Sequence, residues 1–195
     1  MTAAPRFFVD VGSPYAWLAA ERIEQVLPLA PVWEPVLLGA IFAARGSGSW
    51  AQTDRRAAGM AEVERRASAY GLPPVRWPDP WPGNMLLAMR AATAAAQIDA
   101  AASRAFLLAA LRLGFRDGRD LSAPDAVADA ARAAGLDAER LLAAAGEQAV
   151  KARLRECTDE AVALGVCGVP TVVVGTDVFW GDDRLEQATA ALRRD

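Results

Sequence analysis

The sequence contains no histidine. Among its 195 residues the count of this residue is zero. A Ser-His-Asp or Cys-His nucleophile, a zinc ion held by imidazole and a histidine proton shuttle are therefore all excluded. A large part of the common enzymatic repertoire is absent, and no metal site is expected.

Lysine and cysteine are almost as scarce. Lys151 is the only lysine, and it lies in the charged, helical stretch 150–153, which is typical of a solvated face. Schiff-base chemistry is therefore not expected. The two cysteines, Cys157 and Cys167, form no C-x-x-C pair. We expect two free thiols with a packing role, in a reducing compartment.

Excess positive charge and long apolar runs are also missing. The chain has 21 Lys+Arg against 24 Asp+Glu, a net charge of -3, so nucleic-acid binding is not expected. No run approaches the ~18 apolar residues of a membrane span, because Arg90, Gln97, Asp99 and Arg104 interrupt the alanine-rich segment 86–110. The N-terminus has no signal-peptide pattern. We expect a cytoplasmic location and no membrane partner.

The chain opens with a β-α-β pattern. Residues 6–11 are rich in aromatic and β-branched residues and predict a buried strand. Ser13 and Pro14 are typical of a helix start, and the apolar spacing predicts a helix that continues to Pro28. Residues 32–38 predict a second strand, and its internal proline, Pro35, indicates an edge or irregular position.

Helical patterns then replace the strand signal. They occur at residues 57–70, 86–96, 102–113, 127–134 and 150–164. The segment 46–49 predicts a flexible loop, and the proline-rich segment 72–83 predicts an irregular crossing between helices.

Strand patterns return near the C-terminus. Residues 171–174 and 178–180 flank a turn and predict a β-hairpin, which a closing helix follows. The order β-α-β, helices, β-β-α is that of a thioredoxin-like α/β fold with a large inserted all-helical domain. We expect residues 1–38 and 166–195 to form the thioredoxin-like domain and residues 39–165 to form the insertion.

Three sequence blocks carry a family resemblance. They read D-V-G-S-P-Y-A-W-L at 10–18, P-G-N-M-L-L-A-M-R at 82–90, and G-V-C-G-V-P-T at 165–171 with F-W-G-D-D-R-L at 179–185. The chain resembles the 2-hydroxychromene-2-carboxylate isomerases and kappa-class glutathione transferases, which are relatives of the DsbA-like proteins. The resemblance covers essentially the whole chain, and it implies glutathione as the cofactor.

The resemblance implies a role for each motif. Ser13 would be catalytic and would donate a hydrogen bond to the thiolate of glutathione. A hydroxyl donor and a helix N-terminus together lower a thiol pKa by about two units without histidine. Val169 and a cis Pro170 would pair with the cysteinyl backbone of glutathione, and Asp182 and Asp183 would meet its γ-glutamyl group, with Asp183 at the better match.

Two positions depart from the family pattern. Ser47 stands in the loop where the family often has asparagine, and Arg56 is the nearest match to the lysine that meets the glycyl carboxylate. Arginine keeps that charge with a different geometry. Tyr15, Trp17, Trp81 and Asn84 are candidates for a substrate pocket, with core packing as the equal alternative for the aromatic residues.

The resemblance implies a glutathione-dependent isomerase that acts on a small aromatic pyruvate or chromene carboxylate through reversible thiolate addition. A kappa-class glutathione transferase is the nearest alternative. A DsbA-like disulfide oxidoreductase is disfavoured, because Ser13 and Ala16 occupy both positions of the would-be C-x-x-C motif. A non-catalytic thiol-binding module is a further alternative that the Ser47 and Arg56 departures would fit. The family expectation for the assembly is a homodimer.

Overall fold

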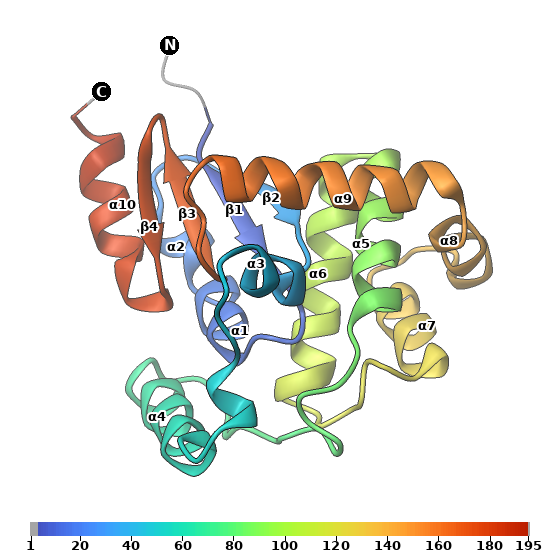
Figure 1. Cartoon of the computed structure of the whole chain (residues 1–195), viewed down its shortest axis with the longest axis horizontal. Helices are drawn as coiled ribbons and strands as arrows, with labels where there is room; N and C mark the ends of the chain where they lie inside the picture. The colour runs from blue at the N-terminus through green and yellow to red at the C-terminus, as the bar shows by residue number, and fades with distance from the viewer. Residues whose placement is uncertain (1–3, 195) are drawn as a thin grey trace.

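A four-stranded mixed sheet organises the fold (Figure 1). The computed structural model describes residues 4–194. The strands are β1 (Arg6–Val9), β2 (Val32–Pro35), β3 (Thr171–Val174) and β4 (Asp177–Trp180), in the spatial order β2-β1-β3-β4. β1 runs parallel to β2 and antiparallel to β3, and β3 and β4 form a hairpin. The predicted β-α-β and β-β-α ends are confirmed.

Helices occupy the rest of the chain. They are α1 (Pro14–Ala20), α2 (Ile23–Val26), α3 (Leu38–Ala44), η1 (Trp50–Gln52), α4 (Arg56–Ala69), α5 (Leu86–Ile98), α6 (Ala100–Phe115), α7 (Pro124–Ala133), α8 (Ala138–Ala145), α9 (Gln148–Ala163), η2 (Asp182–Arg184) and α10 (Leu185–Leu192). In Figure 1, α10 lies at the left beside β4, while α7 and α8 lie at the far right. α5 and α6 pack against each other, and both contact β2.

The sheet is covered on both faces. Successive side chains of a strand point to opposite faces, so Phe7 and Val9 share one face and Phe8 occupies the other. Phe7 and Val9 join a large cluster of buried residues with α1, α5, α6 and α10. Phe8 joins a smaller cluster that includes Ile41 of α3 and Cys157 of α9. This double cover explains why the central strands β1 and β3 read as continuous apolar runs.

The large cluster runs without interruption from the sheet into the helical block. It contains Phe7 and Val172 from the strands together with Trp17, Phe106 and Leu141 from the helices. The helices between β2 and β3 therefore share a core with the sheet. The predicted boundaries of a separate helical domain stay a prediction.

The expected single helix up to Pro28 is instead two short helices. α1 ends at Ala20, and α2 starts at Ile23. Between them, Glu21 pairs with Arg112 of α6 at 2.7 Å, whereas the Arg22 guanidinium donates to the backbone carbonyl of Asp182 at 3.2 Å. The two adjacent side chains thus bind different elements at the helix break.

The first two strands are also shorter than expected. β1 ends at Val9, and β2 ends at Pro35. Leu38, predicted as the end of the second strand, is the first residue of α3. Pro35 does lie in an edge strand, as its missing N–H requires.

Candidate active site

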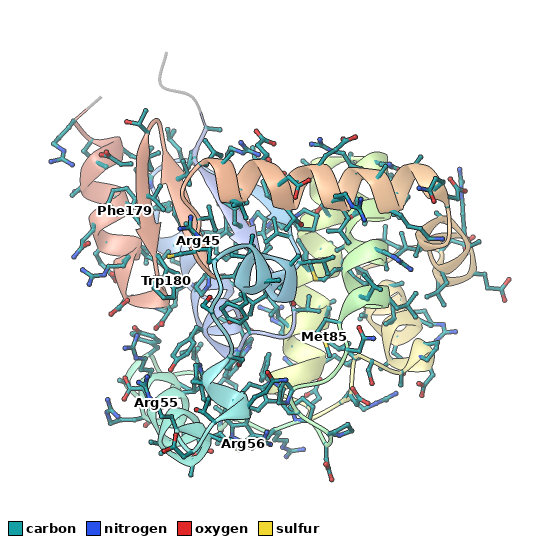
Figure 2. All side chains as sticks on the ribbon, in the orientation of Figure 1. Arg45, Arg55, Arg56, Met85, Phe179 and Trp180 are labelled. Atoms are coloured by element: carbon teal, nitrogen blue, oxygen red, sulfur yellow. The ribbon has the colours of Figure 1, made fainter. Side chains whose placement is uncertain are left out.

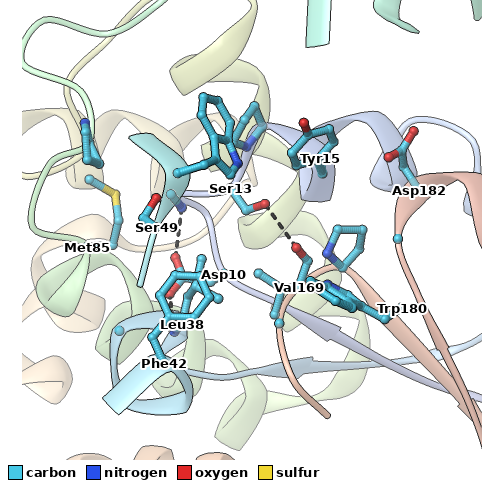
Figure 3. A pocket seen from close by; sticks show the side chains of 18 of the residues that line it. Asp10, Ser13, Tyr15, Leu38, Phe42, Ser49, Met85, Val169, Trp180 and Asp182 are labelled. Atoms are coloured by element: carbon cyan, nitrogen blue, oxygen red, sulfur yellow. Dashed lines mark hydrogen bonds between the residues drawn. The ribbon is translucent and has the colours of Figure 1, made fainter. Parts of the chain in front are cut away.

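A cavity of about 560 Å³ lies where the start of α1 meets the start of β3 (Figure 3). Its wall also includes parts of α3, η1, η2 and the 81–85 segment. The cavity brings together most of the residues that the sequence nominates: Ser13, Tyr15, Trp81, Val169, Pro170, Asp182 and Asp183.

Ser13 caps α1 with its side chain. Its φ and ψ of -96° and 119° are extended, and its Oγ accepts from the N–H of Ala16 at 3.3 Å. The same hydroxyl donates to the carbonyl of Val169 at 3.2 Å (Figure 3). Ser13 is 4% exposed. The structure thus places this hydroxyl between the first helix and the proline segment, as the two sequence motifs predict.

The proline segment forms the opposite wall. The Val169–Pro170 peptide bond is cis, as expected. Within residues 4–194, no hydrogen-bond acceptor faces the Val169 N–H. Gly168 packs against the Trp180 indole so closely that a Cβ at this position would lie 2.7 Å from Nε1. Only glycine therefore lets Trp180 sit against this segment.

The two adjacent aspartates of η2 have different surroundings. Asp182 is 1% exposed, and its carboxylate accepts from Arg66 at 2.9 Å and from the Tyr70 hydroxyl at 2.9 Å. The Asp183 side chain is 49% exposed, and its closest cations are Arg66 at 3.6 Å and Arg184 at 3.9 Å. Because the protein itself occupies both oxygens of Asp182, Asp183 is the carboxylate that a ligand can reach.

Burial and neighbouring charges shift the pKa values of Asp182 and of two nearby tyrosines. Burial raises the pKa of Asp182, while Arg66 and Tyr70 act in the opposite direction. Burial and the neighbouring Asp182 carboxylate raise the pKa of Tyr70 to about 12. Burial likewise raises the pKa of Tyr15. Both phenols are therefore neutral donors at physiological pH.

Asp10 is a buried carboxylate that was not among the predicted site residues. It is 4% exposed, and its two oxygens accept from the backbone N–H groups of Gly12 and Leu38, each at 2.8 Å. Burial raises the pKa of Asp10 to about 6, although both hydrogen bonds lower it. The signal in the sequence is an acidic residue placed between a buried strand and Ser13.

Aromatic and thioether side chains build the remaining wall. Phe42, Trp50, Trp81 and Met85 line it. The Trp50 and Trp81 ring centroids are 5.3 Å apart, and the Trp81 indole N–H donates to the Gly12 carbonyl at 3.2 Å. In Figure 2, Met85 and Trp180 lie on either side of α3. This half of the cavity suits a flat apolar group.

Trp17 and Asn84 lie outside the cavity wall. Trp17 is fully buried, stacks with Phe115 at a centroid distance of 6.4 Å and donates to Glu21 at 3.1 Å. It is two positions from Tyr15 on the same helix, so the two side chains point in nearly opposite directions. Asn84 caps the start of α5, where its Oδ1 accepts from the N–H of Leu86 at 3.0 Å.

Ser47 and Arg56 also lie outside the cavity wall. Ser47 is exposed in its loop, and Ser49 lines the cavity in its place. The Arg56 guanidinium donates to the backbone carbonyls of Ala51 and Trp81 and lies over the Trp81 ring at 5.3 Å. Its bonds hold the aromatic wall in place, and its side chain is not part of the wall. In Figure 2, Arg55 and Arg56 lie at the lower edge of the view.

Arg66 and Trp180 were not predicted as site residues either. Trp180 stands in the F-W-G motif and could have been found there. Arg66 carries no such signal, because it is one of two adjacent arginines on a largely exposed helix. Its ion pair with Asp182 of η2 distinguishes Arg66 from Arg65, whose side chain is 70% exposed.

The chain matches the DsbA-like thioredoxin domain over residues 6–193. It belongs to this family. Over 95% of its length it is 26% identical to a 2-hydroxychromene-2-carboxylate isomerase from Sphingobium xenophagum, of which 96% is covered. The resemblance seen in the sequence motifs is thereby confirmed.

Solved structures of this family share the fold. A 2-hydroxychromene-2-carboxylate isomerase superposes with a TM-score of 0.80 at 23% identity, over 98% of this chain and 95% of the other. A probable DsbA oxidoreductase from Streptomyces coelicolor superposes with a TM-score of 0.73 at 21% identity, over 98% of this chain and 90% of the other. The predicted thioredoxin-like fold is confirmed.

This DsbA-like domain has no thiol in its cavity wall as far as residues 4–194 describe it. Cys157 is buried on α9, where burial raises its thiol pKa, and Cys167 is half-buried next to the wall residue Gly168. The described cavity wall therefore contains a methionine thioether, Met85, and no cysteine.

No helix among residues 4–194 is both long and apolar enough to cross a lipid bilayer.

Proposed function

We propose that this protein is a glutathione-dependent isomerase of the 2-hydroxychromene-2-carboxylate isomerase type. The observation that carries the proposal is the Ser13 hydroxyl, which lies opposite Val169 and cis-Pro170 in a cavity whose described wall has no thiol. The similarity to a curated isomerase over nearly the full length of both chains supports an isomerase rather than a disulfide enzyme.

The cavity residues fit glutathione. The Val169 N–H lacks an acceptor within residues 4–194, which suits pairing with a peptide-like ligand. The half-exposed Asp183 carboxylate suits the γ-glutamyl ammonium. Arg66 belongs to the same wall but is already paired with Glu62 at 2.7 Å and with Asp182. These residues would hold glutathione along the η2 side of the cavity.

Glutathione supplies a thiol that adds reversibly to a conjugated double bond, which permits rotation about the resulting single bond before elimination. Ser13 stabilises negative charge on the sulfur by donating its hydroxyl hydrogen, which now bonds to the Val169 carbonyl. A hydrogen bond to a charged acceptor contributes ~1.5–3 kcal/mol, which corresponds to about one or two pKa units. Histidine is not required for this activation.

The apolar half of the cavity would hold the aromatic substrate. Trp50 and Trp81 present large rings there, and Phe42 and Met85 complete the wall.

The test is Ser13→Ala, with Ser68→Ala on the exposed face of α4 as the matched control. We expect Ser13→Ala to lower turnover of 2-hydroxychromene-2-carboxylate by about 10- to 100-fold, because ~1.5–3 kcal/mol of charge stabilisation is lost. The ultraviolet absorbance of the ionised thiol in bound glutathione should fall in parallel. Ser68→Ala should change neither quantity.

Unchanged turnover and unchanged thiol absorbance in Ser13→Ala would show that Ser13 has no such role. A parallel assay with a halogenated nitroaromatic electrophile separates isomerase from kappa-class transferase activity, since a transferase would use the same sulfur site with a different acceptor. Conjugation without isomerisation would reject the isomerase assignment.

A further inference from the structure

Asp10 is a buried titratable group of the cavity wall to which the proposed chemistry assigns no step. Its Oδ1 accepts from the N–H of Gly12 and its Oδ2 from the N–H of Leu38 (Figure 3). Its own backbone carbonyl accepts from the N–H of Ser13 at 3.2 Å. One residue therefore contacts both the loop that carries Ser13 and the first residue of α3.

Both segments that Asp10 joins shape the cavity. Ser13 supplies the hydroxyl, and α3 contributes Leu38 and Phe42 to the wall. The Ser13 loop is otherwise held by the Trp81 indole, which donates to the Gly12 carbonyl, and by the Met85 side chain, which packs against Gly12. Of these contacts, only the Asp10 carboxylate links the loop to α3.

No cation pairs with the Asp10 carboxylate within residues 4–194. The other charged or titratable residues of the cavity wall are Tyr15, Arg66, Asp182, Asp183 and Arg184. In Figure 3, Tyr15 and Asp182 lie on the far side of Ser13 from Asp10. The hydrogen-bond partners of the Asp10 carboxylate in the described residues are thus the backbone N–H groups of Gly12 and Leu38.

We propose, on the basis of the proposed function, that the Asp10 carboxylate is a positioning group that ties the Ser13 loop to α3 and so fixes the Ser13 hydroxyl relative to Val169. A carboxylate accepts two N–H donors with its two oxygens, whereas a protonated carboxyl or an amide presents a hydrogen to one of them. The neutral form therefore leaves one donor unpaired and loosens the tie.

The first experiment follows backbone amide signals of the wild-type chain by NMR as the pH is changed. The signals of Gly12, Ser13 and Leu38 should move together with a midpoint near the Asp10 pKa of about 6. This readout requires neither a variant nor any catalytic activity. Signals that stay unchanged through this range would overturn the proposal.

The second experiment compares Asp10→Asn with Thr158→Val. Thr158 Oγ1 accepts from the N–H of Leu37 at 3.1 Å, so the control removes a neighbouring anchor of α3 without touching the Ser13 loop. We expect Asp10→Asn to lower kcat by about 100-fold, the scale of a 1 Å misplacement of a catalytic group. Thr158→Val should lose stability and keep its kcat.

The pH profile completes the test. Wild-type kcat should fall below a pH of about 6 as Asp10 becomes protonated, and this limb should be missing in Asp10→Asn. An Asp10→Asn protein with wild-type kcat and a wild-type pH profile would overturn the positioning role. Absence of any glutathione-dependent activity in the wild-type protein would instead reject the proposed function, and the amide titration would still decide whether Asp10 ties the two segments.

Discussion

Two buried carboxylates, Asp10 and Asp182, lie in the wall of the same cavity and have different hydrogen-bond partners. Their exposed fractions are 4% and 1%. Asp182 faces the Arg66 guanidinium and the Tyr70 hydroxyl, both at 2.9 Å, whereas among residues 4–194 the Asp10 carboxylate has two backbone N–H partners and no cation. The two carboxylates are thus similarly buried, but among residues 4–194 a cation pairs with Asp182 and none pairs with Asp10.

The presence or absence of a cation affects the pKa of each buried carboxylate. A buried carboxylate without a cation loses much of its hydration, and backbone N–H groups restore only a part. The pKa of Asp10 therefore rises to about 6. Burial raises the pKa of Asp182 as well, but Arg66 and Tyr70 oppose the rise. The pKa of both carboxylates is thus raised by burial, and a cation opposes the rise at Asp182, where Arg66 forms an ion pair.

Arg66→Leu should leave Asp182, like Asp10, as a buried carboxylate without a paired cation. It leaves Asp182 buried without an ion-pair partner among residues 4–194, and removing one partner of a buried pair costs ~3–5 kcal/mol. Because Arg66 is 28% exposed, we expect the lower part of this range, a loss of about 3 kcal/mol in the free energy of unfolding at neutral pH.

Urea denaturation measures this loss. Arg65→Leu is the matched control, since the Arg65 side chain is 70% exposed and, among residues 4–194, pairs with Glu62 alone. Its effect should remain within about 0.5 kcal/mol. Equal losses for the two variants would contradict the structural role of the Arg66–Asp182 pair.

The raised pKa of Asp10 should make the free energy of unfolding depend on pH. Its folded-state pKa of about 6 lies above its ordinary value of 3.8, so the folded protein binds more protons between these values. Stability from this group is therefore greatest at acid pH and is lost as the pH rises through about 6. The loss should amount to about 2–3 kcal/mol, because a pKa difference of one between the folded and unfolded states corresponds to ~1.4 kcal/mol.

Urea denaturation of wild type and Asp10→Asn at about pH 4 and about pH 7 isolates this contribution, because the other titrating groups are common to both proteins. The wild type should lose more stability than the variant over this interval. An identical change in both proteins would show that Asp10 titrates no differently in the folded and unfolded states.

Tyr70→Phe should make a smaller change at the paired carboxylate. It removes the hydroxyl that donates to Asp182 Oδ2 and keeps the ring beneath the Arg22 guanidinium, which lies 3.8 Å from the ring centroid. We expect a loss of about 1.5 kcal/mol in unfolding free energy, since Arg66 remains. Thermal denaturation measures it, and a loss as large as that of Arg66→Leu would reverse the order of the two partners.

Local motifs account for what the sequence predicted of the site. Ser13 caps the helix that it immediately precedes, and Pro170 immediately precedes β3, so their places in the fold depend on adjacent residues. Asp183 likewise lies in η2, directly after its first residue, Asp182. The strands were predicted from short runs rich in aromatic and β-branched residues, and the helices from the helical spacing of apolar residues, so both predictions depend on short windows of sequence.

The remaining site depends on directions and on contacts between distant elements. Tyr15 and Trp17 were predicted together, but helical geometry turns Trp17 into the core. Arg56 was expected to meet a ligand; one of its guanidinium nitrogens donates to the carbonyls of Ala51 and Trp81, and its ligand role stays a prediction. Arg66 reaches Asp182 across 116 positions of sequence. A single sequence carries no local pattern from which such pairings follow.

The uninterrupted hydrophobic cluster predicts that the protein unfolds as a single cooperative unit. Because Trp17 of α1 and Phe106 of α6 belong to one body of buried residues with Phe7 of β1, neither the sheet nor the helical block can melt while leaving the other intact. Heating should give one calorimetric transition whose measured and van't Hoff enthalpies agree. A ligand held in the cavity would then raise the melting temperature of the entire chain, helical block included.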